Sequence, residues 1–274
     1  NYKEKPMLNN TKHWLIVSKH NIQFKVTLNC DKVLSKDYLL KGRKESYMQE
    51  VEKFVSIIHE NLRPNITIQS IDSEDPVVVE HIPDSWSLLG CGNYAAVFTH
   101  ENFEDYVVKI YAKGRPGLKE EIEVYKAIGN HLAYSGLVYY TEEYLILKRI
   151  RGITLYNCFK LGIKIPQKII KDIDEALEYA RKRGLYPHDV HVKNIMMMDN
   201  RGVVVDISDF KQKEYCYLWD DFKKAYYKYY LPFLYKYTIP IPESILNFIR
   251  KSYKNYKKLK KKIKKVKSLI LMKY

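Results

Sequence analysis

The chain has 274 residues, 46% of them hydrophobic, and a formal net charge of +15, which is enough material for one bilobal unit or two modest domains. Its four cysteines stand far apart without a C-x-x-C pair, which argues against a zinc site or a disulfide framework and favours a reducing compartment. No apolar run approaches the ~18 residues that span a bilayer, so we expect a cytoplasmic protein without a transmembrane segment.

The sequence of the first 150 residues predicts an extension followed by strands. Residues 1–66 form an amino-terminal extension with one helix over 45–62, whose apolar residues recur at helical spacing and which Pro64 ends. Short runs rich in Val, Ile and Tyr follow, separated by Gly, Asn, Asp and Pro, and one helix over 119–128 interrupts them. The predicted strands are Ile66–Ile68, Val77–Val79, Ser87–Leu89, Tyr106–Tyr111, Leu137–Tyr140 and Tyr144–Ile150.

After Gly152 the pattern becomes helical. Pro166 opens a helix that Gly184 ends, a valine strand over 203–205 follows, and Trp219 begins a further helix. Strands followed by helices predict an α+β fold of two lobes. We therefore divide the chain into four segments: the extension 1–66, a strand-rich lobe 67–150, a helical lobe 151–249 and a basic tail 250–274.

A glycine-rich stretch lies at 90–97, between two strand-like segments. Glycines let a hairpin backbone come close to phosphates, and exposed amides bind such anions. The same pattern is typical of an ordinary tight hairpin, so both interpretations stay open. The candidate residues are Gly90, Gly92, Ala95 and Val97.

Lys109 stands alone inside an apolar strand, and a glutamate-rich helix follows it. A mid-strand lysine is usually solvent-facing, but one that binds phosphates needs a carboxylate to hold it. Glu121 fits best, because apolar residues three, four and seven positions later would turn its helix face inward; Glu123 is the second choice. The acids also have a simpler explanation, since a helix dipole favours them in the first turn.

The strongest motif is the polar loop Asp189–Asn194, which follows a helix and precedes the valine strand. Asp189 is suited to orient a hydroxyl or accept its proton, and Lys193 to contact a transferring phosphate. Asn194 offers an oxygen to Mg²⁺, a cation that prefers such ligands. A carboxylate after three apolar residues, Asp206, is costly to bury unless it is paired or metal-bound; Asp209 competes for that role.

Taken in order, these residues resemble the protein-kinase-like superfamily over about residues 86–230. The Asp-Val-His-x-x-Asn form is similar to a compact atypical branch that includes RIO-type kinases, aminoglycoside phosphotransferases and lipopolysaccharide-core kinases. The resemblance implies a bilobal enzyme that uses ATP and Mg²⁺. It assigns catalysis to Asp189 and Lys193, Mg²⁺ binding to Asn194 and Asp206, and ATP binding to Gly90, Gly92, Ala95, Val97, Lys109 and Glu121.

Several features depart from the pattern of typical protein kinases. Ala95 replaces a usual third glycine, Pro187 replaces the usual histidine before the catalytic Asp, and Asp206 is followed by Ile-Ser instead of Phe-Gly. Only a short stretch separates Asp206 from Trp219, and no Ala-Pro-Glu follows. We expect transfer to Ser or Thr of a protein in an atypical-kinase manner. The alternatives are a sugar-type small-molecule kinase and an inactive kinase fold that binds nucleotide or scaffolds a partner.

The tail concentrates the charge of the chain. Residues 250–274 contain 12 of the 47 Lys and Arg residues and no acid, so the rest carries only 35 basic against 32 acidic residues. Two interpretations stay open: a helix packed on the body, or a helix that binds nucleic acid, an acidic protein or a membrane surface. The spacing of the apolar residues predicts a basic amphipathic helix: Tyr256, Leu259, Ile263, Val266 and Ile270.

Overall fold

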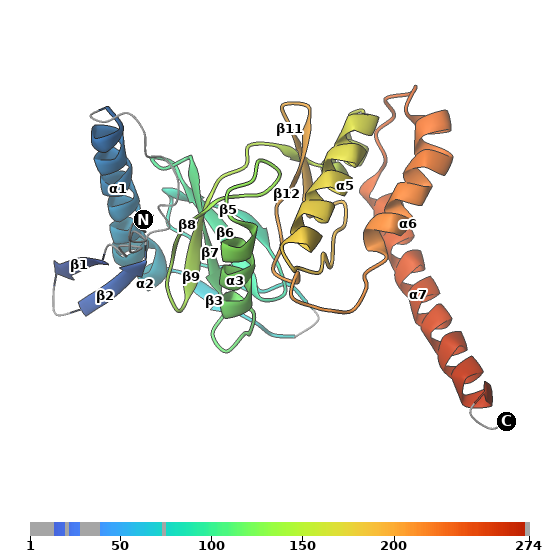
Figure 1. The fold of residues 1–274 in the computed structure, drawn as a ribbon, viewed down its shortest axis with the longest axis horizontal. Helices are drawn as coiled ribbons and strands as arrows, with labels where there is room; N and C mark the ends of the chain where they lie inside the picture. The colour runs from blue at the N-terminus through green and yellow to red at the C-terminus, as the bar shows by residue number, and fades with distance from the viewer. Residues whose placement is uncertain (1–13, 20–21, 28–38, 73–74, 272–274) are drawn as a thin grey trace, which may run out of the picture. The chain divides into compact units, whose positions relative to one another are not determined.

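The computed structural model describes residues 14–19, 22–27, 39–72 and 75–271 (Figure 1). The chain divides into two compact units. Unit 1 comprises Asn1–Ile150, Glu178–His188 and Ile207–Tyr215; unit 2 comprises Arg151–Leu177, Asp189–Asp206 and Cys216–Tyr274. The fold class is α+β, with a strand-rich sheet region and helices, as the sequence predicted.

Unit 1 is built on a five-stranded antiparallel sheet in the order β5-β6-β7-β9-β8. The single helix that interrupts its strands, α3, runs from Leu118 to Ile128 and lies against this sheet (Figure 1). The strands are β5 (Trp86–Cys91), β6 (Ala95–His100), β7 (Tyr106–Tyr111), β8 (Leu137–Tyr140) and β9 (Tyr144–Lys148).

The two faces of the central strand β7 have different neighbours. Because strand side chains alternate, Tyr106, Val108 and Ile110 share one face and Lys109 and Tyr111 the other. The first set joins the hydrophobic core of unit 1, whereas the second set faces α3 through polar contacts.

A long amino-terminal helix packs on this face of the sheet and completes the core of unit 1. Helix α1 (Leu39–Ile57) continues as a π-helical turn, η1 (Ile58–Leu62), and a last turn, α2 (Arg63–Asn65). Phe54, which is fully buried, stacks on Trp86 and Tyr106 of the sheet, with ring centroids 5.7 Å apart in both pairs. The division of the chain at residue 66 stays a prediction, but this helix is part of the core of unit 1.

Two small antiparallel pairs complete the strands of unit 1. The first joins β1 (Trp14–Lys19) to β2 (Ile22–Thr27). The second joins β3 (Thr67–Gln69) to β4 (Val78–Glu80). The backbone amide of Val77 donates to the carbonyl of Gly92, so the β3–β4 pair is tied to the glycine-rich hairpin.

Unit 2 combines helices with a small sheet in the order β10-β11-β12. Helix α5, which supplies residues to both units, buries Ile169, Ile170 and Ile173 completely. A Cβ at Gly202 would lie 2.8 Å from the Ile169 carbonyl oxygen, so only glycine lets β12 approach α5 this closely. The elements are β10 (Ile153–Thr154), α4 (Leu155–Leu161), α5 (Gln167–Lys182), β11 (Ile195–Met198), β12 (Arg201–Val204), α6 (Leu218–Ala225), η2 (Tyr226–Leu234) and α7 (Glu243–Leu271).

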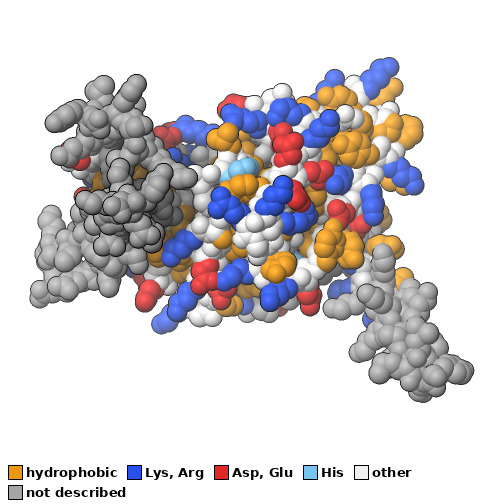
Figure 2. Space-filling model, in the orientation of Figure 1, with side chains coloured by type: hydrophobic (Ala, Val, Ile, Leu, Met, Phe, Trp, Pro, Cys, Tyr) orange, Lys and Arg blue, Asp and Glu red, His pale blue; other side chains and the backbone are white. Residues whose placement is uncertain are grey.

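The surface carries both signs of charge. On the face drawn in Figure 2, Lys and Arg side chains are interspersed with Asp and Glu side chains across the described residues. None of the helices in the described part of the chain is both long and apolar enough to cross a membrane.

Candidate active site

A buried ion pair links the sheet of unit 1 to α3. Lys109 Nζ lies 2.8 Å from Glu121 Oε1, and their side chains are only 11% and 0% exposed. Lys109 is therefore not a solvent-facing strand lysine. Two charges are costly to remove from water, so a buried pair needs good geometry and further hydrogen bonds to persist.

The second-choice glutamate has a different partner. Glu123 is exposed and pairs with Lys211, whose hydrogen bond lowers the pKa of the Glu123 carboxyl below its ordinary value. Of the two acids weighed for Lys109, Glu121 is thus the one that the structure places beside it.

Tyr111 is a third member of this cluster that sequence reasoning missed. Its hydroxyl donates to Glu121 Oε2 at 2.5 Å, and Lys109 Nζ lies 5.8 Å from the centre of its ring. The signal that was available is position, since Tyr111 follows Lys109 by two residues and so shares its face of β7. Tyrosine is so common in this chain that residue type alone did not distinguish it.

The glycine-rich stretch forms the β5–β6 hairpin. Gly90 pairs with Val97 and Cys91 with Ala96 across a register shift at 88–90, and the Gly92 amide donates to the buried Ala95's carbonyl. Neither glycine has a positive φ, and a Cβ would meet nothing within 4 Å at Gly90 and only an ordinary contact at Gly92. The hairpin itself therefore does not require these glycines, which favours the interpretation that they make room for a ligand.

The polar loop Asp189–Asn194 of unit 2 is held together by hydrogen bonds between its own residues. The Asn194 side-chain nitrogen donates to the Asp189 carbonyl oxygen at 3.1 Å, and the Asn194 backbone amide donates to the His191 carbonyl oxygen. Asp189 has a φ of 52°, and its carboxylate, 45% exposed, lies 3.6 Å from His191 Nε2. The loop thus presents an accessible carboxylate, and the Asn194 side-chain oxygen takes no part in these bonds.

A strand pairing and one hydrogen bond bring the end of this loop next to the end of β12 and the residue after it. Ile195 pairs with Val204, and the Val205 amide donates to the Asn194 carbonyl oxygen at 3.0 Å. Strand β12 ends at Val204, so Asp206 lies two residues beyond it and not directly at its end as the sequence suggested. The half-buried Asp206 and Asn194 therefore come from adjacent backbone segments of unit 2.

Lys193 lies over an aromatic ring. Its Nζ is 4.6 Å from the centre of the Tyr156 ring, and the Tyr156 backbone amide donates to the Val192 carbonyl oxygen. A cation over a ring face is held weakly, so Lys193, whose side chain is exposed, keeps freedom to contact an anion.

Asp221, in the first turn of α6, contacts α7. Asp221 accepts hydrogen bonds from Tyr253 and Lys257 of α7. Burial raises the pKa of the Asp221 carboxyl, but these two bonds and the positive charges of Lys257 and Lys224 together outweigh it, and the net effect is a lowered pKa. Asp221 therefore anchors α7. Trp219 of the same helix is held by α5, where Asp174 accepts from the indole nitrogen at 2.7 Å.

The short stretch after Asp206 is folded onto unit 1. Phe210 is fully buried and lies edge-on to Tyr134, and its carbonyl oxygen accepts from the Tyr186 amide at 2.7 Å. Lys211 pairs with Glu123 of α3, and His188 Nδ1 lies 3.1 Å from the Glu214 carbonyl oxygen. Residues 207–215 are thus a packed connection within unit 1.

Similar proteins are kinases by name. A Bacillus subtilis protein, "Putative serine/threonine-protein kinase YrzF", is 30% identical over 165 residues, which are 59% of this chain and 77% of that protein. CBL-interacting protein kinase 10 of Oryza sativa is 24% identical over 139 residues, or 45% of this chain and 30% of that protein. MAP kinase-interacting serine/threonine-protein kinase 1 of Xenopus tropicalis is 29% identical over 140 residues, or 45% and 33%.

No family model matches the chain. The similarity to the Bacillus protein nevertheless reaches 30% identity and spans more than two thirds of that protein's length. It agrees with an α+β fold that contains a five-stranded antiparallel sheet, a helix on that sheet, and a buried lysine–glutamate pair between the two. On these grounds the chain belongs to the protein-kinase-like superfamily.

Proposed function

We propose that the chain is an active ATP-dependent kinase that transfers the γ-phosphoryl group to a serine or threonine hydroxyl of a protein. The observation that carries this proposal is the Lys109–Glu121 pair, at 2.8 Å and almost fully buried. An apolar pair would fill the same space without a desolvation penalty, so a buried pair of charges favours a chemical role for the lysine. Kinases use such a lysine to bind phosphates.

Within unit 1, Lys109 would bind the ATP phosphates and the β5–β6 hairpin would cover them. The hairpin suits that role because Gly90 and Gly92 leave space where other residues would place a Cβ. Ala95, which replaces a third glycine, is buried and contributes its carbonyl to the Gly92 amide, so it stabilises the hairpin and leaves the approach of a ligand to its neighbours.

Within unit 2, Asn194 and Asp206 would hold Mg²⁺. No group of three or more His, Cys, Asp or Glu that fits a metal occurs among the described residues. That agrees with Mg²⁺, which is commonly bound by one or two protein oxygens together with substrate phosphates. The donor set fits, because both side chains offer oxygen and come from adjacent segments. When bound, Mg²⁺ neutralises charge on the phosphates.

Asp189 would orient the acceptor hydroxyl and take its proton. In the reaction the acceptor oxygen forms a bond to the γ-phosphorus, the bond from phosphorus to the bridging oxygen breaks, and ADP leaves. The 45% exposed carboxylate of Asp189 is accessible to an incoming hydroxyl. Lys193, which is exposed and lies over the Tyr156 ring, is suited to contact the transferring phosphoryl group.

One observation favours a second acceptor class. The stretch that follows Asp206 is short and packed through Phe210 and Lys211, so it offers little free chain for binding a peptide. A small molecule such as a sugar, or a single dedicated protein, would need no such segment. The names of the relatives favour a protein acceptor, which is why we place it first.

The acceptor is tested with labelled ATP and Mg²⁺. We expect autophosphorylation or labelling of a generic protein substrate, detected as phosphoserine or phosphothreonine by mass spectrometry. Turnover on a panel of sugars without protein labelling would establish the small-molecule alternative instead.

The proposed role of Asp206 as a Mg²⁺ ligand is tested with a matched pair of variants. Asp206→Asn should reduce transfer on the order of ~10²-fold or more, whereas Asp209→Asn, whose carboxylate accepts a local bond from Gln212, should keep most activity. Failure of the folded wild-type chain to transfer phosphate with either Mg²⁺ or Mn²⁺, while it still binds ATP, would support the inactive nucleotide-binding alternative.

We also propose that the basic tail binds an anionic partner: nucleic acid, an acidic protein or a membrane surface. In the described part of its apolar stripe, Tyr256 and Leu259 are 56% and 58% exposed, while α7 is held through Tyr253 and Lys257 on Asp221. The other stripe side chains, at 263, 266 and 270, lie outside the described residues. Binding to DNA, RNA, anionic vesicles or polyglutamate should weaken steeply with salt; binding that ignores salt would exclude this role.

A further inference from the structure

Tyr111 gives the second oxygen of Glu121 its own hydrogen-bond donor. Lys109 Nζ occupies Oε1 at 2.8 Å, and the Tyr111 hydroxyl occupies Oε2 at 2.5 Å. The two donors come from residues on the same face of β7, and the acceptor from the first turns of α3. Each carboxylate oxygen therefore has its own donor. The two bonds fix the rotation of the carboxylate plane as well as its distance from Lys109.

Backbone geometry lets α3 begin against the Tyr111 ring. Gly117 caps the helix with a φ of 110°, a backbone conformation that residues with a side chain rarely adopt. A Cβ there would lie 3.4 Å from Tyr111 Cε1. The ring thus meets the helix start directly, and Leu118, the first helical residue, follows at once.

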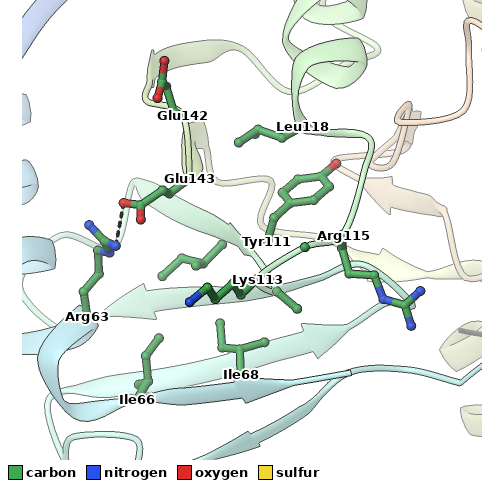
Figure 3. A pocket seen from close by; sticks show the side chains of 12 residues that line it. Arg63, Ile66, Ile68, Tyr111, Lys113, Arg115, Leu118, Glu142 and Glu143 are labelled. Carbon is green, nitrogen blue, oxygen red and sulfur yellow. Dashed lines mark ion pairs between the residues drawn. The ribbon is translucent and has the colours of Figure 1, made fainter. Parts of the chain in front are cut away.

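Tyr111 also lines a half-open pocket of about 490 Å³, together with residues of α2, β3, the end of β7 and the β8–β9 turn. Figure 3 shows Tyr111 between Leu118 and the loop that carries Lys113 and Arg115. Tyr111 is itself buried, and its bond to Glu121 fixes where the hydroxyl lies.

We propose that Tyr111 is the positioning residue that keeps Glu121 in place, so that the Lys109 ammonium stays fixed when it binds phosphate. This inference rests on the proposed function. When a nucleotide draws the ammonium toward its phosphates, the Tyr111 hydroxyl keeps hold of the second carboxylate oxygen and so opposes rotation of the Glu121 carboxylate with the ammonium. Tyr111 itself touches neither the nucleotide nor the acceptor in this role.

The test compares two single variants, each of which removes the hydroxyl of one tyrosine. Tyr111→Phe should raise the KM for ATP and lower kcat/KM for ATP on the order of ~10-fold, because small misplacements of a binding group are costly. The KM for the acceptor should not change. Tyr106→Phe is the matched control: Tyr106 lies on the same strand, and its hydroxyl donates to a carboxylate, Glu50, at 3.2 Å, but on the opposite face. It should keep the wild-type KM for ATP.

A double variant separates positioning from general destabilisation. In a Lys109→Met background, Tyr111→Phe should have no further effect on nucleotide affinity, because its effect passes through Lys109. An unchanged KM in Tyr111→Phe, an equal loss in Tyr106→Phe, or additive losses in the double variant would each overturn the inference.

Crystal structures of the two variants give a readout that does not depend on activity. The Glu121 carboxylate should turn in Tyr111→Phe and keep its place in Tyr106→Phe, and an unmoved carboxylate in both would overturn the inference. A wild-type chain that neither binds ATP nor transfers phosphate would instead overturn the proposed function, which keeps the two failures distinguishable.

Discussion

Removing one charge of the Lys109–Glu121 pair should destabilise the protein far more than removing both. Glu121→Leu leaves an ammonium that is 11% exposed without its carboxylate, and breaking a buried pair in this way costs about 3–5 kcal/mol. Lys109→Met leaves the fully buried carboxylate with Tyr111 as its remaining donor in this cluster, which should cost a similar amount. Replacing both charges by apolar side chains is often close to neutral.

The double variant Lys109→Met/Glu121→Leu should therefore recover most of the loss. It still takes the acceptor away from the Tyr111 hydroxyl, which costs about 1–3 kcal/mol when a buried group loses its partner. Single losses of about 3–5 kcal/mol each and a double loss of about 1–3 kcal/mol give a coupling free energy of at least about 3 kcal/mol, at or above the upper end for residues in contact. The double variant should be folded and stable but inactive.

Urea unfolding at neutral pH, followed by tryptophan fluorescence, measures all four free energies of this cycle. Glu123→Gln is the control, because it removes a carboxylate from the same helix whose partner, Lys211, is solvent-exposed; its unfolding midpoint should match that of the wild type. Single variants that each cost less than ~1 kcal/mol, or a double variant as costly as the sum of the two, would refute the reasoning.

Three further outcomes are expected. Phe54→Ala should lower the free energy of unfolding by about 3–5 kcal/mol, because the ring is fully buried among aromatic neighbours; a loss under ~1 kcal/mol in urea unfolding would mean that α1 is not part of the core. Burial raises the pKa of Tyr134 and Tyr144 above the usual 10, so above pH 10 these hydroxyls ionise more readily in the unfolded chain than in the folded one. The free energy of unfolding is therefore unaffected by them below pH 10 and falls as the pH rises beyond it, by about 1.4 kcal/mol per pH unit for each. Tyr144→Phe should make the fall measured between pH 10 and 11.5 shallower, and an unchanged slope would contradict the assignment. Gly202→Ala should destabilise by about 1–3 kcal/mol in thermal unfolding, through contact with the Ile169 carbonyl; a wild-type Tm would show that α5 yields without cost.

Local patterns in the sequence anticipated the elements that are amphipathic along one face. The helix that carries Glu121 begins at Leu118 instead of Lys119, and the helix after Pro166 ends near Gly184, as its periodicity and end signals indicated. Strand β6 was not predicted. It begins with two alanines, which are depleted in strands, whereas β7, all of whose residues are buried, is rich in Val, Ile and Tyr and was predicted.

What the sequence left undecided depended on tertiary neighbours. Helical spacing indicated the helix that contains Phe54 but not the sheet on which it packs. The choice between Glu121 and Glu123 was favoured by spacing, yet only the fold shows that the latter pairs with Lys211. Tyr111 was missed because a hydroxyl's partner on another element leaves no local pattern.

The most direct test of the kinase assignment compares two aspartates with similar backbones. Asp189 and Asp199 have positive φ values of 52° and 47°, so Asn at either position perturbs the chain alike. Phosphate transfer from labelled ATP is measured for the wild type, Asp189→Asn and Asp199→Asn, with ATP affinity measured in parallel. We expect Asp189→Asn to bind ATP but lose transfer on the order of ~10²-fold or more, and Asp199→Asn to remain active. Full activity in Asp189→Asn would contradict the account.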